Sequence, residues 1–368
     1  MRRAWSALAL FTALTSGPAA AQAVCEPDPQ LTEAAAELLL ARNERPSAHA
    51  LSRAVRAAGS DAVGLHALFV PAGAPRDSDS QWLTTLRTRV DGALHCGRAD
   101  NVAGHMLIAL GRGAALEPID DSARVVRGRL QPGFREAELV IETADAQLIR
   151  VGVSAESLSK GVTLAPDLSL PLKVQLVARG PAGPRPVAER QVEARGAQET
   201  QDTRVVRAED VAAGMASAKL SQNVTPGRQP GSAAENSGAE LSQRLLTLRA
   251  ERGRGGLRAN RLLREAASRH AEEVCAKGKV AHEVEAGVGP DARLARAGLE
   301  ARVLGEAIAR ADGTVSALDA LKNSPSHLFT LLDQRFTDFG IGVAQDGAQK
   351  FCYVVLLCAW PRYVGQRR

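Results

Sequence analysis

Aromatic residues are scarce in this 368-residue sequence, at 3%, with seven Phe, three Trp and two Tyr. Proteins that bind single-stranded nucleic acid stack bases on rows of aromatic side chains along strongly basic grooves. The net charge is only +5, and the basic residues are spread over the whole chain. Nucleic acid is therefore not an expected partner.

Long apolar runs are also missing. After residue 23, no stretch approaches the roughly 18 uninterrupted apolar residues that a membrane helix needs. Before it, two arginines precede an apolar stretch from Ala4 to Leu14, and a small-residue triplet ends at Ala23. This is the three-part plan of a secretory signal peptide. We expect residues 1–23 to be removed on export, leaving a secreted or periplasmic protein of net charge near +3 without a transmembrane segment.

Cysteine is sparse as well. The sequence contains five cysteines, and no two of them have the C-x-x-C spacing of a zinc site. Export permits disulfides, but the odd number leaves at least one thiol outside any intrachain pair. Cys25 with Cys96 would close the N-terminal region, and Cys275 with either Cys352 or Cys358 would tie a C-terminal helix to a strand. Because Cys352 and Cys358 are six residues apart, both would point to one face of an unbroken strand, and the spacing leaves the pairing open.

The first region after the leader, residues 24–118, contains strong helix formers. Residues 31–41 are rich in Ala, Leu and Glu, and residues 78–96 place apolar side chains at helical intervals. We predict a small helical domain here.

The next region changes to a period of two. Leu172, Val174 and Leu176 alternate with less apolar neighbours, and glycines interrupt the runs at turn-like intervals. Residues 124–208 are therefore predicted to form a small antiparallel β-sandwich, acting as a spacer or a binding module. Residues 209–238 are polar and rich in Gly, Ser and Pro, which is typical of a linker.

The last region, residues 239–368, begins with two expected helices, near residues 240–251 and 260–276. The second has an apolar stripe that includes His270, which favours a buried histidine with a hydrogen-bonded ring over a ligand.

Five short motifs follow these helices in a fixed order. They are Val280-Ala281-His282-Glu283, Leu304-Gly305-Glu306-Ala307, Asn323-Ser324-Pro325-Ser326-His327, the run from Phe336 to Ala344, and a closing strand from Phe351 to Trp360. In this order and spacing the C-terminal third resembles the CAP superfamily, which contains the cysteine-rich secretory, antigen 5 and pathogenesis-related proteins, and especially its bacterial SCP-like members. The resemblance implies an α-β-α sandwich, and hence an α+β protein with a helical domain and a β-sandwich upstream.

The resemblance also implies a cleft that holds His282, Glu306 and His327, with Ser324 beside it. In some members a divalent cation, such as zinc or calcium, binds there, so His282 and His327 are the expected metal ligands. Ala307 and Leu321 depart from the family pattern, which has an asparagine and a tryptophan at these positions.

The family shares no reaction, and the function that the resemblance implies is extracellular binding of a lipid or cell-surface component. The alternative is a hydrolase, in which Ser324 or Ser326, His327 and Glu306 would form a serine-histidine-acid arrangement, or a metal between His282 and His327 would activate water.

Overall fold

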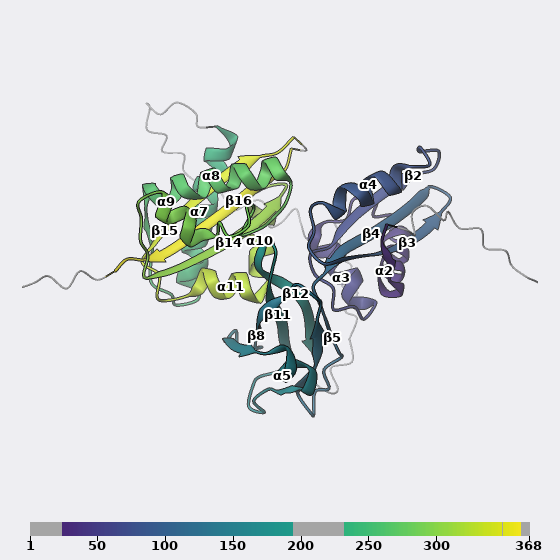
Figure 1. The fold of residues 1–368 in the computed structure, drawn as a ribbon, viewed down its shortest axis with the longest axis horizontal. Helices are drawn as coiled ribbons and strands as arrows, with labels where there is room; N and C mark the ends of the chain where they lie inside the picture. Colours follow the sequence, from purple (N-terminus) through teal and green to yellow (C-terminus); the bar gives the residue numbers. More distant parts are fainter. Residues whose placement is uncertain (1–23, 194–231, 348, 362–368) are drawn as a thin grey trace, which may run out of the picture.

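The computed structural model describes residues 24–193, 232–347 and 349–361. The predicted signal peptide and most of the predicted linker lie outside these residues. Figure 1 shows an N-terminal part in purple and blue, a middle part in teal, and a C-terminal part in green and yellow, with the middle part touching both others. None of the helices within the described ranges combines the length and apolar character that a membrane span requires.

The N-terminal part is a layered α/β structure, so the predicted helical domain at residues 24–118 is wrong. Its strands run in the order β1-β3-β4-β2. The apolar run at residues 106–110 is the centre of β4, covered by α2 and α3 on one face and by α4 on the other. A strand that is buried on both faces loses its alternation, so its sequence resembles a buried helix. The elements are β1 (Glu26–Pro27), α2 (Pro29–Leu40), α3 (Ala48–Ala57), β2 (His66–Pro71), α4 (Ser78–Arg87), β3 (Ala93–Asn101) and β4 (Gly104–Arg112).

The middle part is built on an antiparallel sheet in the order β12-β11-β8-β9, with two-stranded ribbons, β5-β7 and β10-β6, and helix α5 packed against it. The residues of β11 with even numbers, from Leu172 to Ala178, face this core. The period of two therefore predicted the strands of this region. The elements are β5 (Ala114–Leu116), β6 (Val125–Val126), β7 (Gly128–Leu130), β8 (Arg135–Glu142), β9 (Leu148–Val153), α5 (Ala155–Lys160), β10 (Val162–Thr163), β11 (Leu172–Gly180) and β12 (Gly183–Val192).

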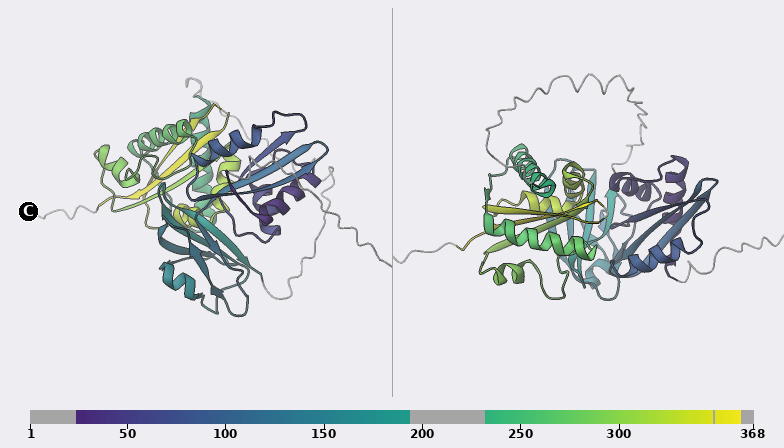
Figure 2. Two further views of the ribbon diagram at one scale, coloured as in Figure 1. Left: turned by 45° about the vertical axis from the view of Figure 1, so that its right-hand side comes forward. Right: turned by 90° about the horizontal axis from the view of Figure 1, so that it is seen from above.

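The C-terminal part is the expected α-β-α sandwich. Its sheet has the order β13-β15-β16-β14, and Figure 2 shows this sheet between α7 and α8. Helix α7 begins at Ala233, inside the predicted linker, where Ser232 and Glu235 form a capping box. The elements are α7 (Ala233–Glu251), β13 (Arg258–Ala259), α8 (Arg261–Lys277), α9 (Pro290–Arg296), β14 (Val303–Ala311), α10 (Thr314–Lys322), α11 (Pro325–Leu332), β15 (Asp338–Gln345) and β16 (Phe351–Ala359).

Strand β16 lies at the centre of this sandwich and is buried on both faces. Its residues with even numbers, from Cys352 to Cys358, pack toward α8, and those with odd numbers, from Tyr353 to Leu357, pack toward α7, α10 and α11. The neighbouring strand β15 lies directly against α8. A Cβ atom added to Gly340 or Gly342 would lie only 2.2 or 2.1 Å from a backbone nitrogen of that helix. Glycine is therefore required at both positions for this approach.

Two disulfides are present. Cys25 pairs with Cys96, and Cys275 on α8 pairs with Cys352 on β16. Cys358 is a buried free thiol on the same face of β16, and burial raises its pKa to about 12. Of the two partners left open for Cys275, Cys352 is the one used. Disulfides are characteristic of oxidising compartments, which agrees with the expected export.

Candidate functional site

The cleft residues expected from the sequence come from three parts of the C-terminal domain. Glu306 lies on β14 and is directed to the face of the sheet that α8 covers, like its partner in register, Leu356. His282 follows α8 in an irregular segment, and Ser324 and His327 lie at the start of α11.

Glu306 is the centre of this arrangement, and its side chain is 1% exposed. Its Oε1 lies 2.8 Å from Nδ1 of His282, and its Oε2 accepts a hydrogen bond from the guanidinium of Arg293 on α9. Nε2 of the buried His270 lies 3.9 Å from Oε1. The carboxylate is therefore held between two imidazoles and a guanidinium.

These contacts decide the charge of Glu306. Burial alone would raise the pKa of its carboxyl, but the hydrogen bond from His282 and the charges of His282 and Arg293 hold that pKa below its ordinary value. The ionised Glu306 accepts a hydrogen bond from Nδ1–H of His282, so Nε2 is the ring nitrogen outside this contact. The carboxylate thereby fixes both the tautomer and the orientation of His282.

Arg293 also helps to fix the position of His282. Its Nη1 donates to the carbonyl oxygens of His282, at 2.7 Å, and Val288, at 3.0 Å. The arginine therefore ties the segment that carries His282 to the carboxylate of Glu306, and it is buried with that carboxylate.

His327 is the second histidine of the expected cleft, and it lies in the first turn of α11. Burial, together with a smaller effect of the charge of His282, lowers the pKa of His327 to about 4. At neutral pH its imidazole is therefore uncharged, so it can accept or donate a single proton but cannot bind an anion by charge.

The serines at the start of α11 do not pair with this imidazole. Oγ of Ser324 donates to Oε1 of Gln175 at 3.1 Å and contacts Oγ of Ser326 at 3.2 Å. Within the described part of the chain, no hydrogen bond joins either serine to His327. The expected serine-histidine-acid arrangement is not assembled in this geometry, because Glu306 is bonded to His282 and Arg293, and Ser324 is bonded to Gln175.

A metal centre requires more free ligands than this cleft offers. His282 and His327 supply two imidazoles, whereas both oxygens of Glu306 are already bonded to His282 and Arg293. Over the described ranges, no group of three or more His, Cys, Asp or Glu side chains is placed to hold a metal ion. Protein zinc sites have at least three such ligands, and these residues do not fit one.

Two residues of the site carry no signal in the sequence. Arg293 is one arginine among many, and Gln175 lies on the less apolar face of a strand in another domain. His270, by contrast, is the buried and bonded histidine that its apolar stripe predicted, with Nε2 3.0 Å from the carbonyl oxygen of Ala281.

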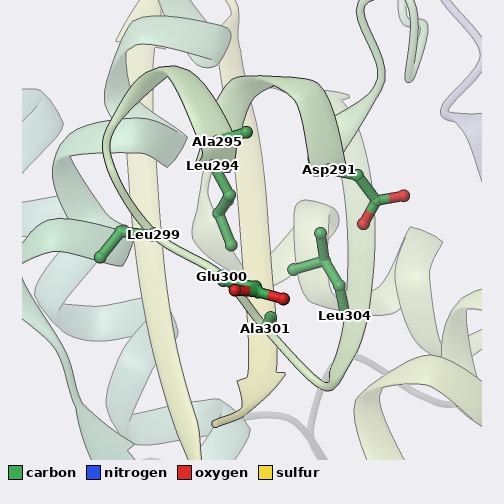
Figure 3. Close-up of a pocket in the computed structure, with 7 residues that line it drawn as sticks. All are labelled: Asp291, Leu294, Ala295, Leu299, Glu300, Ala301 and Leu304. Carbon is green, nitrogen blue, oxygen red and sulfur yellow. The ribbon is translucent and has the colours of Figure 1, made fainter. Parts of the chain in front are cut away.

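A separate shallow hollow of about 330 Å³ lies between α9 and the start of β14, and Figure 3 shows the residues around it. Leucines and alanines form most of its lining, with the carboxylates of Asp291 and Glu300 among them. None of His282, Glu306 and His327 lines this hollow, so it is not the cleft that the sequence led us to expect.

The lowered pKa of His327 leads to a first prediction, on the pH dependence of folding stability. Because its pKa is lowered to about 4 in the folded protein and is about 6.5 in an unfolded chain, the unfolded chain binds more protons between these pH values. Folding stability is therefore fully present above pH 6.5 and is lost as the pH falls toward 4. We expect urea unfolding to show at most about 2.4 kcal/mol of this loss in stability between pH 7 and pH 4.5, and we expect His327→Gln to remove it. An equal pH dependence in both proteins would contradict the assignment.

Comparisons with known proteins agree with the geometry of the C-terminal domain. Residues 244–359 match the family described as CAP, the cysteine-rich secretory protein family. No curated protein matches the chain.

Solved structures also match, at low identity. An outer surface protein of Borrelia burgdorferi is 18% identical, with a TM-score of 0.34 over 37% of this chain and 99% of its own. An extracellular SCP-domain protein of Bacillus anthracis is 16% identical, with a TM-score of 0.32 over 66% and 88%. A cysteine-rich secretory protein of Staphylococcus aureus is 15% identical, with a TM-score of 0.30 over 60% and 66%. Residues 244–359 of this chain are a CAP domain of the cysteine-rich secretory protein family.

Proposed function

We propose that this protein is exported and that its CAP domain binds an extracellular lipid or cell-surface component through the cleft of His282, Glu306 and His327. The upstream domains add contacts around this cleft. Catalysis is not part of the proposed function.

One observation carries this proposal: the acid and the serine expected in the cleft are paired with other groups of the chain. Glu306 is committed to His282 and Arg293, and Ser324 is committed to Gln175. A nucleophile must lie within hydrogen-bond reach of its base, and these serines do not. A rigid polar site without an activated nucleophile favours recognition of a partner over its conversion.

The test measures binding and turnover on the same preparation of the mature chain. Binding is followed by sedimentation with vesicles of phosphatidylcholine and phosphatidylglycerol, and turnover by hydrolysis of p-nitrophenyl butyrate. We expect the protein to sediment with the vesicles and to hydrolyse the ester no faster than Ser324→Ala. His282→Gln should weaken vesicle binding severalfold, whereas the exposed Glu300→Gln serves as the matched control.

Three results would overturn the proposal. Ester turnover that is lost in Ser324→Ala or His327→Gln, with circular dichroism unchanged, would establish the hydrolase alternative. Calorimetric titration with zinc, and separately with calcium, should show no micromolar binding. Such binding, if it is lost in His282→Ala/His327→Ala, would instead make the cleft a metal site. If the protein shows no vesicle binding and no turnover, the binding of a lipid is excluded.

A further inference from the structure

One face of strand β11 is turned away from its own domain. Residues with even numbers on β11 enter the core of the middle domain, so Lys173, Gln175 and Arg179 lie on the opposite face. All three contact the CAP domain. Lys173 donates to the carbonyl oxygen of Asn323, Gln175 bonds to the start of α11, and Nη1 of Arg179 lies 2.5 Å from Glu283.

Gln175 makes the contact with the greatest structural consequence. Ser324 occupies the N-cap position of α11, but its side chain makes no capping bond within the helix. Oε1 of Gln175 instead accepts the backbone N–H of Ser326 at 3.1 Å, which is the bond that an N-cap side chain ordinarily provides. The middle domain therefore caps the helix that carries His327.

Gln175 is itself fixed, because it is 2% exposed and donates from Nε2 to Glu189 on β12 at 2.8 Å. Glu189 also lies near Lys173, at 3.6 Å. The face of β11 and β12 that meets α11 thus carries a linked polar network, which orients Gln175 toward α11.

The tip of the same hairpin lies against the other histidine. The backbone N–H of Glu283 donates to the carbonyl oxygen of Ala182 at 3.0 Å. A Cβ atom added to Gly183 would lie 3.1 Å from Cβ of His282. The N-terminal domain secures this tip, since Asp91 accepts from the N–H of Ala182, at 3.1 Å, and from Lys279, at 2.9 Å.

We propose that the middle domain, through its hairpin β11–β12 (residues 172–192), acts as an intramolecular strap over the CAP domain, and that a partner reaches His282 and His327 only when the contact between the two domains is released. One hairpin contacts the chain beside both histidines, through its tip at His282 and through Gln175 at α11. The side chain of His282 is left 16% exposed. For a partner that binds only the open state, the apparent affinity is the intrinsic affinity multiplied by the fraction of open molecules.

This inference rests on the proposed function for the choice of site, but its test measures access to the imidazoles without any lipid. The mature chain is treated with diethyl pyrocarbonate, and the acylation rate of each histidine is measured by peptide mass spectrometry. The exposed His49 provides an internal reference in every molecule. The strap variant is Gln175→Ala/Arg179→Ala, and the control is Arg129→Ala/Gln131→Ala, which removes the same residue types from the middle domain away from the CAP domain.

We expect the strap variant to raise the acylation rate of His282 at least tenfold relative to His49, and the control to leave that rate unchanged. An unchanged rate in a strap variant with native circular dichroism would overturn the proposal.

A second measurement on the unaltered protein does not depend on the variant folding. If the strap opens as a unit, the amide hydrogens of Glu283 and Ser326 should exchange at one common rate, faster than those of β16. Protection equal to that of β16 would show a permanent contact and would also overturn the strap. Failure of vesicle binding, by contrast, would leave both of these measurements unaffected.

Discussion

Replacing Glu306 with glutamine is expected to destabilise the CAP domain by about 3 kcal/mol, at the lower end of the cost of removing one partner from a buried ion pair. The change leaves the guanidinium of Arg293 buried beside a neutral amide and deprives His282 of its charged acceptor. The cost stays at the lower end because Arg293 keeps its bonds to two carbonyl oxygens.

The measurement requires a signal from the CAP domain alone. Of the three tryptophans, Trp5 lies in the predicted leader, Trp82 in the N-terminal domain and Trp360 at the end of β16. In a mature Trp82→Phe background, urea unfolding followed by fluorescence therefore reports on Trp360. The matched control, Glu300→Gln, removes an exposed carboxylate of the same domain and should stay within about 0.5 kcal/mol of the parent.

A double-mutant cycle separates the ion pair from the packing of its members. Glu306→Gln/Arg293→Met removes both charges, and we expect it to be less destabilised than the sum of the two single variants. A cost for Glu306→Gln no greater than that for Glu300→Gln would show that Glu306 does not organise the cleft.

The sequence predicted an element of the CAP domain correctly where its apolar residues followed a single period along the whole element. The apolar stripe of α8 predicted a helix at residues 260–276, and the structure has Arg261–Lys277 with His270 buried. Leu262 of the same helix is 39% exposed, so not every apolar side chain of α8 is buried.

Arginine was the residue type least interpretable from sequence. A charged side chain on a helix is ordinarily solvated, yet Arg249 on α7 is buried and donates to the carbonyl oxygens of Leu331 and Asp333. A buried guanidinium that binds backbone carbonyls from a distant segment leaves no local pattern, and Arg293 was missed for the same reason.

The interface between domains shows a further limit of periodicity. Alternation along β11 correctly separated an apolar face from a polar one, and the polar face is usually the solvated one. Here that face carries Lys173, Gln175 and Arg179 and meets the CAP domain. A polar face that covers another domain has the same composition as one that faces water, so the contact becomes visible only in three dimensions.

Removing the disulfide between Cys275 and Cys352 is expected to have the largest effect on stability. The bridge spans 77 residues and joins α8 to the central strand. The chain-entropy relation for such a loop gives about 4.5 kcal/mol. We expect Cys275→Ala/Cys352→Ala to lose about 4 kcal/mol in the unfolding followed by Trp360, and Cys358→Ala, which removes a buried thiol without a bridge, to lose only about 1 kcal/mol.

Cys358 cannot replace Cys352 as the partner of Cys275 while the fold is intact. Six residues along a strand span about 20 Å, whereas the Cα atoms of a disulfide lie within about 7 Å. The single variant Cys352→Ala should therefore leave two free thiols, at Cys275 and Cys358. In the unaltered protein, a thiol reagent should label nothing when folded, because Cys358 is buried with its pKa raised to about 12, and one thiol in urea. Labelling of Cys352 in urea would instead assign the bridge to Cys358, and an equal stability loss in the two alanine variants would show that the bridge does not stabilise this domain.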